Sequence, residues 1–465
     1  MYSIPENTYD EKSSIASVRN FFSRYGLGPI LKAYIRKRKG IPVSTVVMYL
    51  VSLIYTGRSM FQDMRSASPL AKGFHRDAVY RLLDAASANW RAFLLAVSQR
   101  VIADKDRLTS ESRRSAFVVD DTLFNVPYAR KTELVSKVYD HAEKGKNKYK
   151  WGFRLLTLGW TDGCSFVPVA YRHLASADEK NRRCGREAAH DRRSIAHRIR
   201  NEAVSKATDV MLTLIKAALK SGITAKHVLF DTWFAYPSTM IKVAALGLNV
   251  TARVKDTTKI KYLVGGERKT AKEIFKGNKK RRGRSRYLLS VDVSLYGSES
   301  DGTLPAKLVY IRNRQKRNEW IALISTDTGL GEEEIIALYG KRWSIEVFFK
   351  VCKSYLKLAR EFRQLSYDAL TAHTAIVMLR YMILSVEKRR TEDPRSLGEM
   401  FYLCCDEADD IKFEEALSML INLLSDILRD ESVGLSEEQM RLIMDGFIGN
   451  LPAFIQRCLR PDLRP

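Results

Sequence analysis

The first hundred residues carry apolar side chains at three- and four-residue intervals, the spacing of helices that bury one face. This pattern predicts helices at 28–39, 42–56, 76–84 and 86–103, separated by Gly, Pro and Ser residues. A helical N-terminal domain over residues 1–105 could bind DNA through a helix-turn-helix, or it could be a purely structural bundle. The apolar stretch inside 42–56 is too short to cross a bilayer, which takes about 20 residues, so we expect a buried helix there.

After Arg114 the pattern changes to short apolar runs that are separated by turns and by helical segments. Strands that first form a meander and then alternate with helices are typical of α/β folds. We therefore expect residues 106–254 to form the first part of an α/β core. Strands are predicted at 116–119, 153–160, 166–171, 227–230 and 250–254, and helices at about 201–220 and 237–246.

A Lys- and Gly-rich segment at 255–326 interrupts this alternation. Its short alternating runs predict a mainly β insertion. Helices are predicted again at 332–355 and 366–388, so residues 327–392 are expected to complete the core. Residues 393–465 predict an acidic helical C-terminal region, which could be a dimer surface or a solvated cap.

Charge is the most unusual feature of the composition. The chain of 465 residues has 78 Lys and Arg against 53 Asp and Glu, a formal net charge of +25. Self-repulsion of this size destabilises a compact protein, so the charge indicates an anionic partner. The basic residues are spread along the chain, which favours nucleic acid over a membrane surface. The stretch 253–286 has 14 bases and 3 acids, and its loop residues Lys279, Lys280, Arg281 and Arg282 are candidate DNA contacts.

Several other chemistries are excluded by the sequence. The six cysteines include no CxxC pair, which excludes a zinc ribbon, and the absence of GxxxxGK[ST] predicts no nucleotide cofactor. The polar start predicts no signal peptide, and we expect a cytoplasmic protein that does not bind membranes. Cys184, His190 and His197 have loosely metal-like spacing. They lie among seven arginines, however, and this indicates a basic helix that faces phosphate.

Three acidic positions have the character of a divalent-metal site. Asp120 and Asp121 follow the first predicted strand, and Asp231 follows the fourth, where buried strands reach the edge of a sheet. Glu346 lies far downstream on a predicted helix. Mg²⁺ prefers hard oxygen ligands and keeps several waters, so a few carboxylates are enough. Cleavage of phosphodiesters commonly uses two such ions, which makes these acids candidate catalytic residues.

The helix predicted around Glu346 has one polar face. Tyr339, Arg342, Glu346 and Lys353 fall within an arc of roughly 60° at about 100° per residue. Arg342 and Lys353 could bind phosphates there, or the face could be solvated and carry an Arg342–Glu346 salt bridge. Spacing alone leaves both interpretations open. An apolar stripe that would dock on the sheet is expected beside this face, at Leu338, Ile345, Phe349 and Cys352.

The spacing Tyr339-x₂-Arg342-x₃-Glu346-x₆-Lys353 resembles the YREK signature of the DDE transposases of the insertion-sequence-four family. All four signature residues are present at the family spacing. The resemblance continues in chain order through an Asp-x-Thr, a second strand that ends in Asp, and a β insertion before the Glu helix. It covers about residues 115–390, whereas the terminal regions match only in general layout.

This resemblance implies an RNase H-like core, which is a mixed sheet flanked by helices. It also implies a catalytic triad of Asp120, Asp231 and Glu346 that holds two Mg²⁺ or Mn²⁺ ions. The first acid of the family is usually followed two residues later by Thr or Ser, and Thr122 suits Asp120 in this respect. Asp121 stays an alternative first acid, because it also lies at the predicted strand end.

The activity implied is cut-and-paste transposition of an insertion sequence: hydrolysis at the element ends, a hairpin in some members, and 3′-OH strand transfer into target DNA. Trp320 precedes the signature at a distance similar to that of a Trp that stacks on a flipped base in hairpin-forming members, although it could simply be a core residue. The implied partner is double-stranded DNA, bound by a homodimer in the bacterial nucleoid. An inactive DNA-binding relative and an RNase H-type nuclease without strand transfer are the alternatives.

Overall fold

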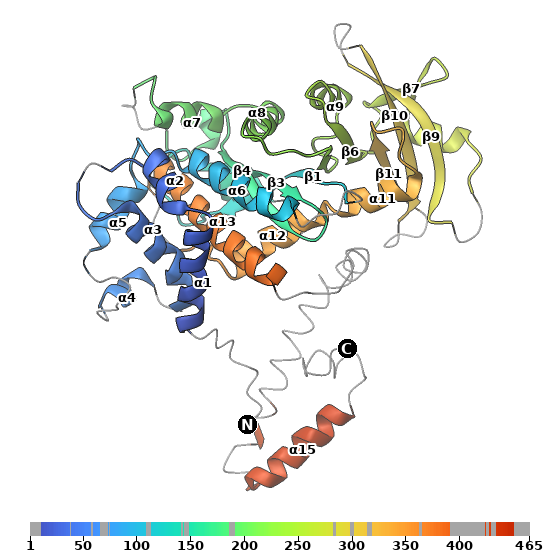
Figure 1. Ribbon diagram of the computed structural model, residues 1–465. Coiled ribbons are helices and arrows are strands. Elements are labelled where there is room, and N and C mark those ends of the chain that lie inside the picture. Colours follow the sequence, from blue (N-terminus) through green and yellow to red (C-terminus); the bar gives the residue numbers. More distant parts are fainter. Residues whose placement is uncertain are drawn as a thin grey trace. The chain divides into compact units, whose positions relative to one another are not determined.

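The computed structural model describes residues 11–390 with short gaps, and residues 424, 427–428 and 434–450 beyond them (Figure 1). Residues Tyr9–Pro394 form one compact unit, and the remaining residues form a second. The second unit contains α15 (Glu437–Gly449), so most of the predicted C-terminal region 393–465 lies outside the described residues. The gaps in the first range are 38, 57–58, 66–72, 74, 108–112, 141–142, 144–147, 186–190, 282–284, 298–301, 314–318 and 362–364.

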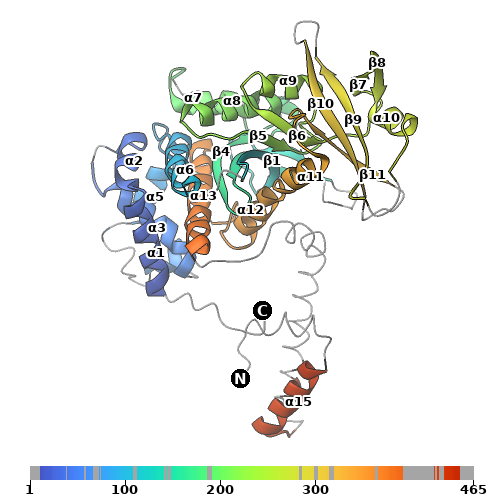
Figure 2. The same ribbon diagram turned by 45° about the vertical axis from the view of Figure 1, so that its right-hand side comes forward.

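The N-terminal part of the larger unit is helical, as its apolar spacing predicts. The helix predicted at 42–56 is buried, and its second part is a 3₁₀ turn (Leu53–Thr56). Figures 1 and 2 show these helices gathered on one side of the sheet. The elements are α1 (Glu11–Arg24), α2 (Leu27–Tyr34), α3 (Val43–Ser52), α4 (Met60–Arg65), α5 (Arg76–Leu83) and α6 (Trp90–Asp106).

A single mixed sheet runs through the described part of the larger unit, with its strands in the order β2-β3-β1-β5-β6-β11-β10-β9-β7-β8 and β4 paired to β3. An antiparallel meander joins through β1 to the parallel strands β5 and β6. The strands are β1 (Ala116–Asn125), β2 (Ser136–Tyr139), β3 (Tyr149–Thr161), β4 (Phe166–Leu174), β5 (His227–Phe230), β6 (Asn249–Arg253), β7 (Lys261–Val264), β8 (Glu267–Thr270), β9 (Tyr287–Tyr296), β10 (Thr303–Arg312) and β11 (Trp320–Ser325). The predicted α/β class, with a mixed sheet flanked by helices, is confirmed.

Helices cover both faces of this sheet. In Figure 2 the helices α7, α8 and α9 lie over one face, and α11, α12 and α13 lie on the other. The insertion predicted at 255–326 is mainly β, and its last strand β11 pairs with β6, so it extends the core sheet. The remaining helices are α7 (Ile195–Ala203), α8 (Ala207–Lys220), α9 (Pro237–Ala244), α10 (Ala271–Gly277), α11 (Glu332–Gly340), α12 (Trp343–Ser354) and α13 (Tyr367–Arg390), with a 3₁₀ turn at Glu179–Asn181.

The long helix α13 lies at the centre of the core and packs against α3, α5, α6, α12 and β4. Its segment Tyr367–Val386 is apolar enough to cross a membrane, with a mean hydropathy of 1.5, but 83% of the window is buried inside the protein. Burial on this scale is what the core helix of a globular protein shows. Arg380 is fully buried on this helix and pairs with Glu361 at 2.6 Å, which neutralises its charge.

Several element boundaries differ from the sequence expectations. The helix predicted at 28–39 ends at Tyr34, and the helix predicted at about 201–220 begins only at Ala207, because α7 ends at Ala203. The strand predicted to end before Asp120 continues to Asn125, because its second half pairs with β3. The single helix predicted at 332–355 is two helices, α11 and α12. The backbone N–H groups of Arg342 and Ser344 bond three residues back, to Tyr339 and Lys341, so the chain tightens between the two helices.

Candidate active site

The parallel register of β1 and β5 brings two of the predicted acids together. Val119 pairs with Phe230 at the last step of this ladder, so Asp120 and Asp231 are the next residue on each strand. Burial raises the pKa of Asp120 to about 7; Arg342 opposes this shift, whereas Asp231 and Asp121 add to it. Asp120 and Asp231 therefore interact electrostatically across the two strands.

Alternation along β1 separates Asp120 from Asp121, because successive side chains of a strand point to opposite faces. Asp120 and Thr122 share the face toward α12, where the Nζ of Lys353 donates to the Oγ1 of Thr122 at 2.7 Å. Asp121 instead forms an ion pair with Arg154 of β3 at 3.4 Å. Asp120, and not Asp121, therefore lies on the face of the sheet that holds Asp231 and Glu346.

Helix α12 is held against the sheet by its apolar side. The predicted stripe of Leu338, Ile345, Phe349 and Cys352 is buried, as expected. Phe348 adds to it, with its ring centroid 5.0 Å from that of Phe166 and 4.7 Å from that of Tyr381. This packing fixes the opposite side of α12, which carries Glu346 and Lys353, beside β1.

Arg342 links the acids of the strand and the helix. Its Nη1 donates to Oδ2 of Asp120 at 3.1 Å, and its Nη2 donates to Oε1 of Glu346. Burial alone would lower the pKa of Arg342, but Tyr339 and the two carboxylates outweigh it and raise the pKa above its ordinary value. The Arg342–Glu346 salt bridge that sequence reasoning left open is therefore present, in a buried setting that includes Asp120.

Tyr339 and Lys353 complete the predicted polar face. The guanidinium carbon of Arg342 lies 5.7 Å from the centroid of the Tyr339 ring. Burial raises the pKa of Tyr339 to about 12, with Arg342 opposing and Asp231 adding to the shift. Burial also lowers the pKa of Lys353. All four signature residues thus lie around Asp120, although they come from two helices instead of one.

The donor set of this site suits a hard divalent cation. Asp120, Asp231 and Glu346 carry carboxylate oxygens, which are the ligands that such a cation prefers. The pKa of Asp120 is raised chiefly by its burial. Among the described residues, however, no group of three or more His, Cys, Asp or Glu side chains is gathered closely enough to hold a metal. The guanidinium of Arg342 stands between two of the carboxylates, so a cation that bound both would displace it.

The other predicted DNA contacts lie in the insertion. Trp320 packs against Phe275 and Tyr310, with its ring centroid 5.4 and 5.0 Å from theirs, and these contacts agree with the core alternative for this residue. The basic loop follows α10. Lys279 and Arg281 are exposed there and Lys280 is half-buried, whereas Arg282 lies outside the described residues.

Two residues near the site were missed by sequence reasoning. Arg154 neutralises Asp121, and its position opposite β1 depends on the register of β3. Trp233 follows Asp231 by two residues, and its backbone N–H donates to Oδ1 of Asp231 at 2.8 Å. Its side chain is 48% exposed. An aromatic residue two positions after a strand-ending Asp was a readable signal for a surface ring beside the site.

Two family models match the chain. The one described as DDE superfamily endonuclease matches residues 43–288, which include Asp120 and Asp231. The chain belongs to this superfamily. A second model, described as archaeal putative transposase ISC1217, matches residues 196–388, which include Asp231 and Glu346. A comparison with curated proteins finds no match.

Membership in the DDE superfamily explains the main features of the fold and the charge. The mixed sheet with helices on both faces is consistent with an RNase H-like nuclease core. An endonuclease or transposase of this superfamily acts on DNA, which accounts for the net charge of +25. Nucleases of the superfamily generally use divalent metal ions, in keeping with the carboxylates on β1, β5 and α12.

Proposed function

We propose that this DDE superfamily endonuclease is a transposase of the insertion-sequence-four type, which cuts and pastes its element. The main support is the parallel register that sets Asp231 beside Asp120, together with the contacts of Arg342 to Asp120 and Glu346. The YREK spacing gives Arg342 and Glu346 independently of the coordinates. Excision by hydrolysis at the terminal inverted repeats, a hairpin intermediate and 3′-OH strand transfer are all part of this proposal.

We assign Asp120, Asp231 and Glu346 as the ligands of two Mg²⁺ or Mn²⁺ ions. When bound, such ions supply Lewis-acid stabilisation of the charge that develops on the phosphate oxygens. The three carboxylates would hold the ions, and Arg342 would then be available to bind a flanking phosphate in a bidentate manner. Lys353 provides a further positive charge beside Thr122.

The remaining predicted contacts serve DNA binding in this proposal. Tyr339 hydrogen-bonds a phosphate near the cleavage position. The exposed residues Lys279 and Arg281 follow the DNA backbone at the insertion. Trp320 is the candidate for base stacking, and exposure of its ring on DNA binding would require it to leave Phe275. Synapsis of two element ends calls for a homodimer on DNA, within the nucleoid.

The catalytic assignment is tested by charge-removing substitutions. Asp231→Asn and Glu346→Gln are expected to abolish Mg²⁺-dependent nicking of duplex DNA carrying the element end, because each removes a metal ligand. DNA binding should be unchanged in both variants. Asp121→Asn is the matched control: it removes a carboxylate next to Asp120 that is paired with Arg154, and it should still cleave. Cleavage by either of the first two variants would refute the assignment.

Strand transfer is tested separately with an element end that already carries a free 3′-OH. We expect the protein to join this end to a supercoiled plasmid when Mg²⁺ or Mn²⁺ is present. Cleavage without joining would indicate an RNase H-type nuclease. Binding of the end without cleavage or joining would indicate an inactive DNA-binding relative. A labelled hairpin on the cleaved product would support the hairpin step.

A further inference from the structure

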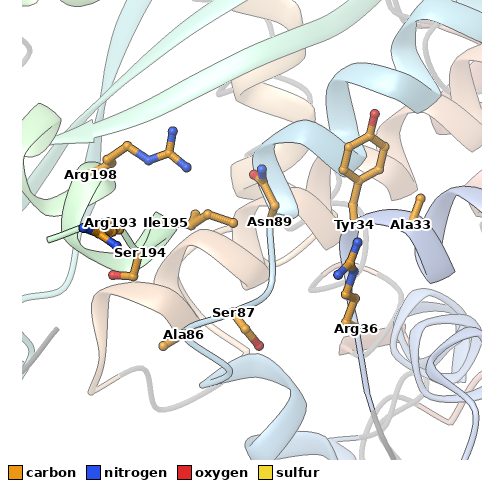
Figure 3. Close-up of a pocket in the computed structure, with 10 residues that line it drawn as sticks. All are labelled: Ala33, Tyr34, Arg36, Ala86, Ser87, Asn89, Arg193, Ser194, Ile195 and Arg198. Carbon is orange, nitrogen blue, oxygen red and sulfur yellow. The ribbon is translucent and has the colours of Figure 1, made fainter. Parts of the chain in front are cut away.

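A basic pocket lies in the larger unit, at the junction of the N-terminal helices with α7 (Figure 3). It has a volume of about 660 Å³, which falls within the range of roughly 300–1,000 Å³ that is common for ligand sites. Figure 3 shows Arg193 and Arg198 on one side and Arg36 on the other, with Asn89 between them. The complete lining is Ala33, Tyr34, Arg36, Ala86, Ser87, Asn89, Arg193, Ser194, Ile195 and Arg198.

The lining is strongly one-sided in charge. It has three arginines and no acidic residue among the described residues, and none of the three forms an ion pair with another described residue. All three side chains are exposed. A concave surface that gathers three guanidinium groups concentrates positive potential and favours an anionic ligand. Arginine also matches phosphate geometry, because its guanidinium can donate two parallel hydrogen bonds.

Two arginines of α7, Arg200 and Arg198, have different roles. Arg200 is buried and pairs with Glu133 at 2.6 Å and with Asp368 at 2.8 Å, which ties α7 to the core. Arg198 is two positions away, which is about 200° around the helix, and it faces the pocket. The same stretch of chain therefore provides Arg200 for the structure of the core and leaves Arg193 and Arg198 at the surface.

The pocket is held in place by hydrogen bonds at its base. The backbone N–H of Asn89 donates to the carbonyl of Tyr34 at 2.9 Å, which joins the end of α2 to the loop before α6. The side chain of Asn89 caps α6 by accepting from the N–H of Ala92 at 3.1 Å. Ser194 caps α7 by accepting from the N–H of His197 at 3.1 Å. These hydrogen bonds fix the backbone at the end of α2 and at the start of α7, next to the three arginines.

We propose that this pocket binds backbone phosphates of the DNA on which the protein acts, as a site separate from the carboxylate cluster. The inference rests on DNA being the partner in the proposed function. A DNA backbone suits the pocket better than a free nucleotide, because the three arginines are exposed and lie on both sides of the pocket, where a polyanion with several phosphates can contact them all. Contacts of this kind position the duplex without reading its sequence.

The test compares two triple variants in DNA binding without metal ions. The pocket variant is Arg36→Ala, Arg193→Ala and Arg198→Ala. The control variant removes three exposed basic residues that do not line the pocket, with Arg19→Ala, Lys216→Ala and Lys220→Ala. Both variants lose the same net charge. Binding to a fluorescent duplex is measured over a series of salt concentrations, and thermal unfolding of both variants is compared with the wild type.

We expect the pocket variant to bind about tenfold or more weakly, with a log–log salt slope shallower by roughly 2 to 3, because each lost phosphate contact removes about 0.9 from the slope. The control variant should stay near the wild type. Equal losses in both variants would show that only net charge matters, and wild-type binding by the pocket variant would mean that DNA does not enter the pocket; either result overturns the proposal.

A second variant tests the concave shape while keeping every arginine. Ser87→Trp places a large ring on the lining, so it should weaken DNA binding at least fivefold, and wild-type binding would overturn the site. Inorganic phosphate and AMP are tested as competitors. If the arginine substitutions weaken their binding but leave DNA binding intact, the pocket serves a small anion and the DNA proposal fails. Because no metal is added, these results are independent of whether Asp231→Asn abolishes cleavage.

Discussion

Replacing Asp120 by Asn should stabilise the protein in a pH-dependent manner when no metal is bound. Asp120 has 17% of its side chain exposed, and burial raises its pKa from the ordinary 3.8 to about 7. Between these two values the folded protein binds more protons at this position than the unfolded chain does. The ionised carboxylate therefore costs stability progressively from about pH 4 to pH 7, and by a constant amount above pH 7.

The size of this effect follows from the difference in pKa. A shift of about 3 units corresponds to roughly 4 kcal/mol, since one unit is about 1.4 kcal/mol. Asparagine has nearly the same shape and no charge, so the variant lacks this pH-dependent term. The quantity to compare is the free energy of unfolding of the variant minus that of the wild type. This difference should rise by up to about 4 kcal/mol between pH 4 and pH 8. Any pH-independent change in hydrogen bonding cancels in this comparison.

The measurement is chemical denaturation of both proteins in EDTA over this pH range. Asp209→Asn is the control, because Asp209 is an exposed carboxylate on α8. A difference of the same size and pH dependence in this control would mean that the burial of Asp120 is not the cause. A flat difference for Asp120→Asn, or one that falls as the pH rises, would refute the view that burial penalises the ionised carboxylate of Asp120.

Two further predictions concern the packing of the core. Arg200→Met should lower the free energy of unfolding by roughly 3–5 kcal/mol, because it leaves the buried carboxylates of Glu133 and Asp368 without their partner; a loss below 1 kcal/mol in chemical denaturation would contradict this. Gly152→Ala should cost about 1–3 kcal/mol or more, because a Cβ there would lie 2.1 Å from a backbone oxygen of β1. Gly185→Ala is the matched control with no atom within 4 Å, and equal melting temperatures for the two variants would disprove the clash.

The elements near the site were predicted well where the local pattern was strong. The strand His227–Phe230 and the helix α13 were predicted within about two residues, because a short apolar run suits a buried strand and a much longer one suits a helix. The end of β1 was wrong because pairing with β3 extends the strand through polar residues. The break before Arg342 was missed, although Gly340 at the end of α11 is a residue type that commonly ends helices.

The choice between Asp120 and Asp121 shows how tertiary structure completes the sequence information. The sequence places both residues on one strand, and alternation puts their side chains on opposite faces. Which of the two faces the site is known only when the elements that pack on each face are known. Here Arg154 of β3 forms an ion pair with Asp121. On the other face, Arg342 hydrogen-bonds Asp120 and Lys353 hydrogen-bonds Thr122. These partners lie tens to hundreds of positions away along the chain.

The sequence by itself determined the α/β class, the strongly basic character and the order of the acidic residues, because periodicity, charge and spacing are local properties. Only the tertiary structure decided that the Arg342 guanidinium bridges Asp120 and Glu346, and that Arg36 shares a pocket with Arg193 and Arg198. Contacts of this kind depend on strand register and on how helices dock. Those are set by the packing of the whole core, which no local pattern contains.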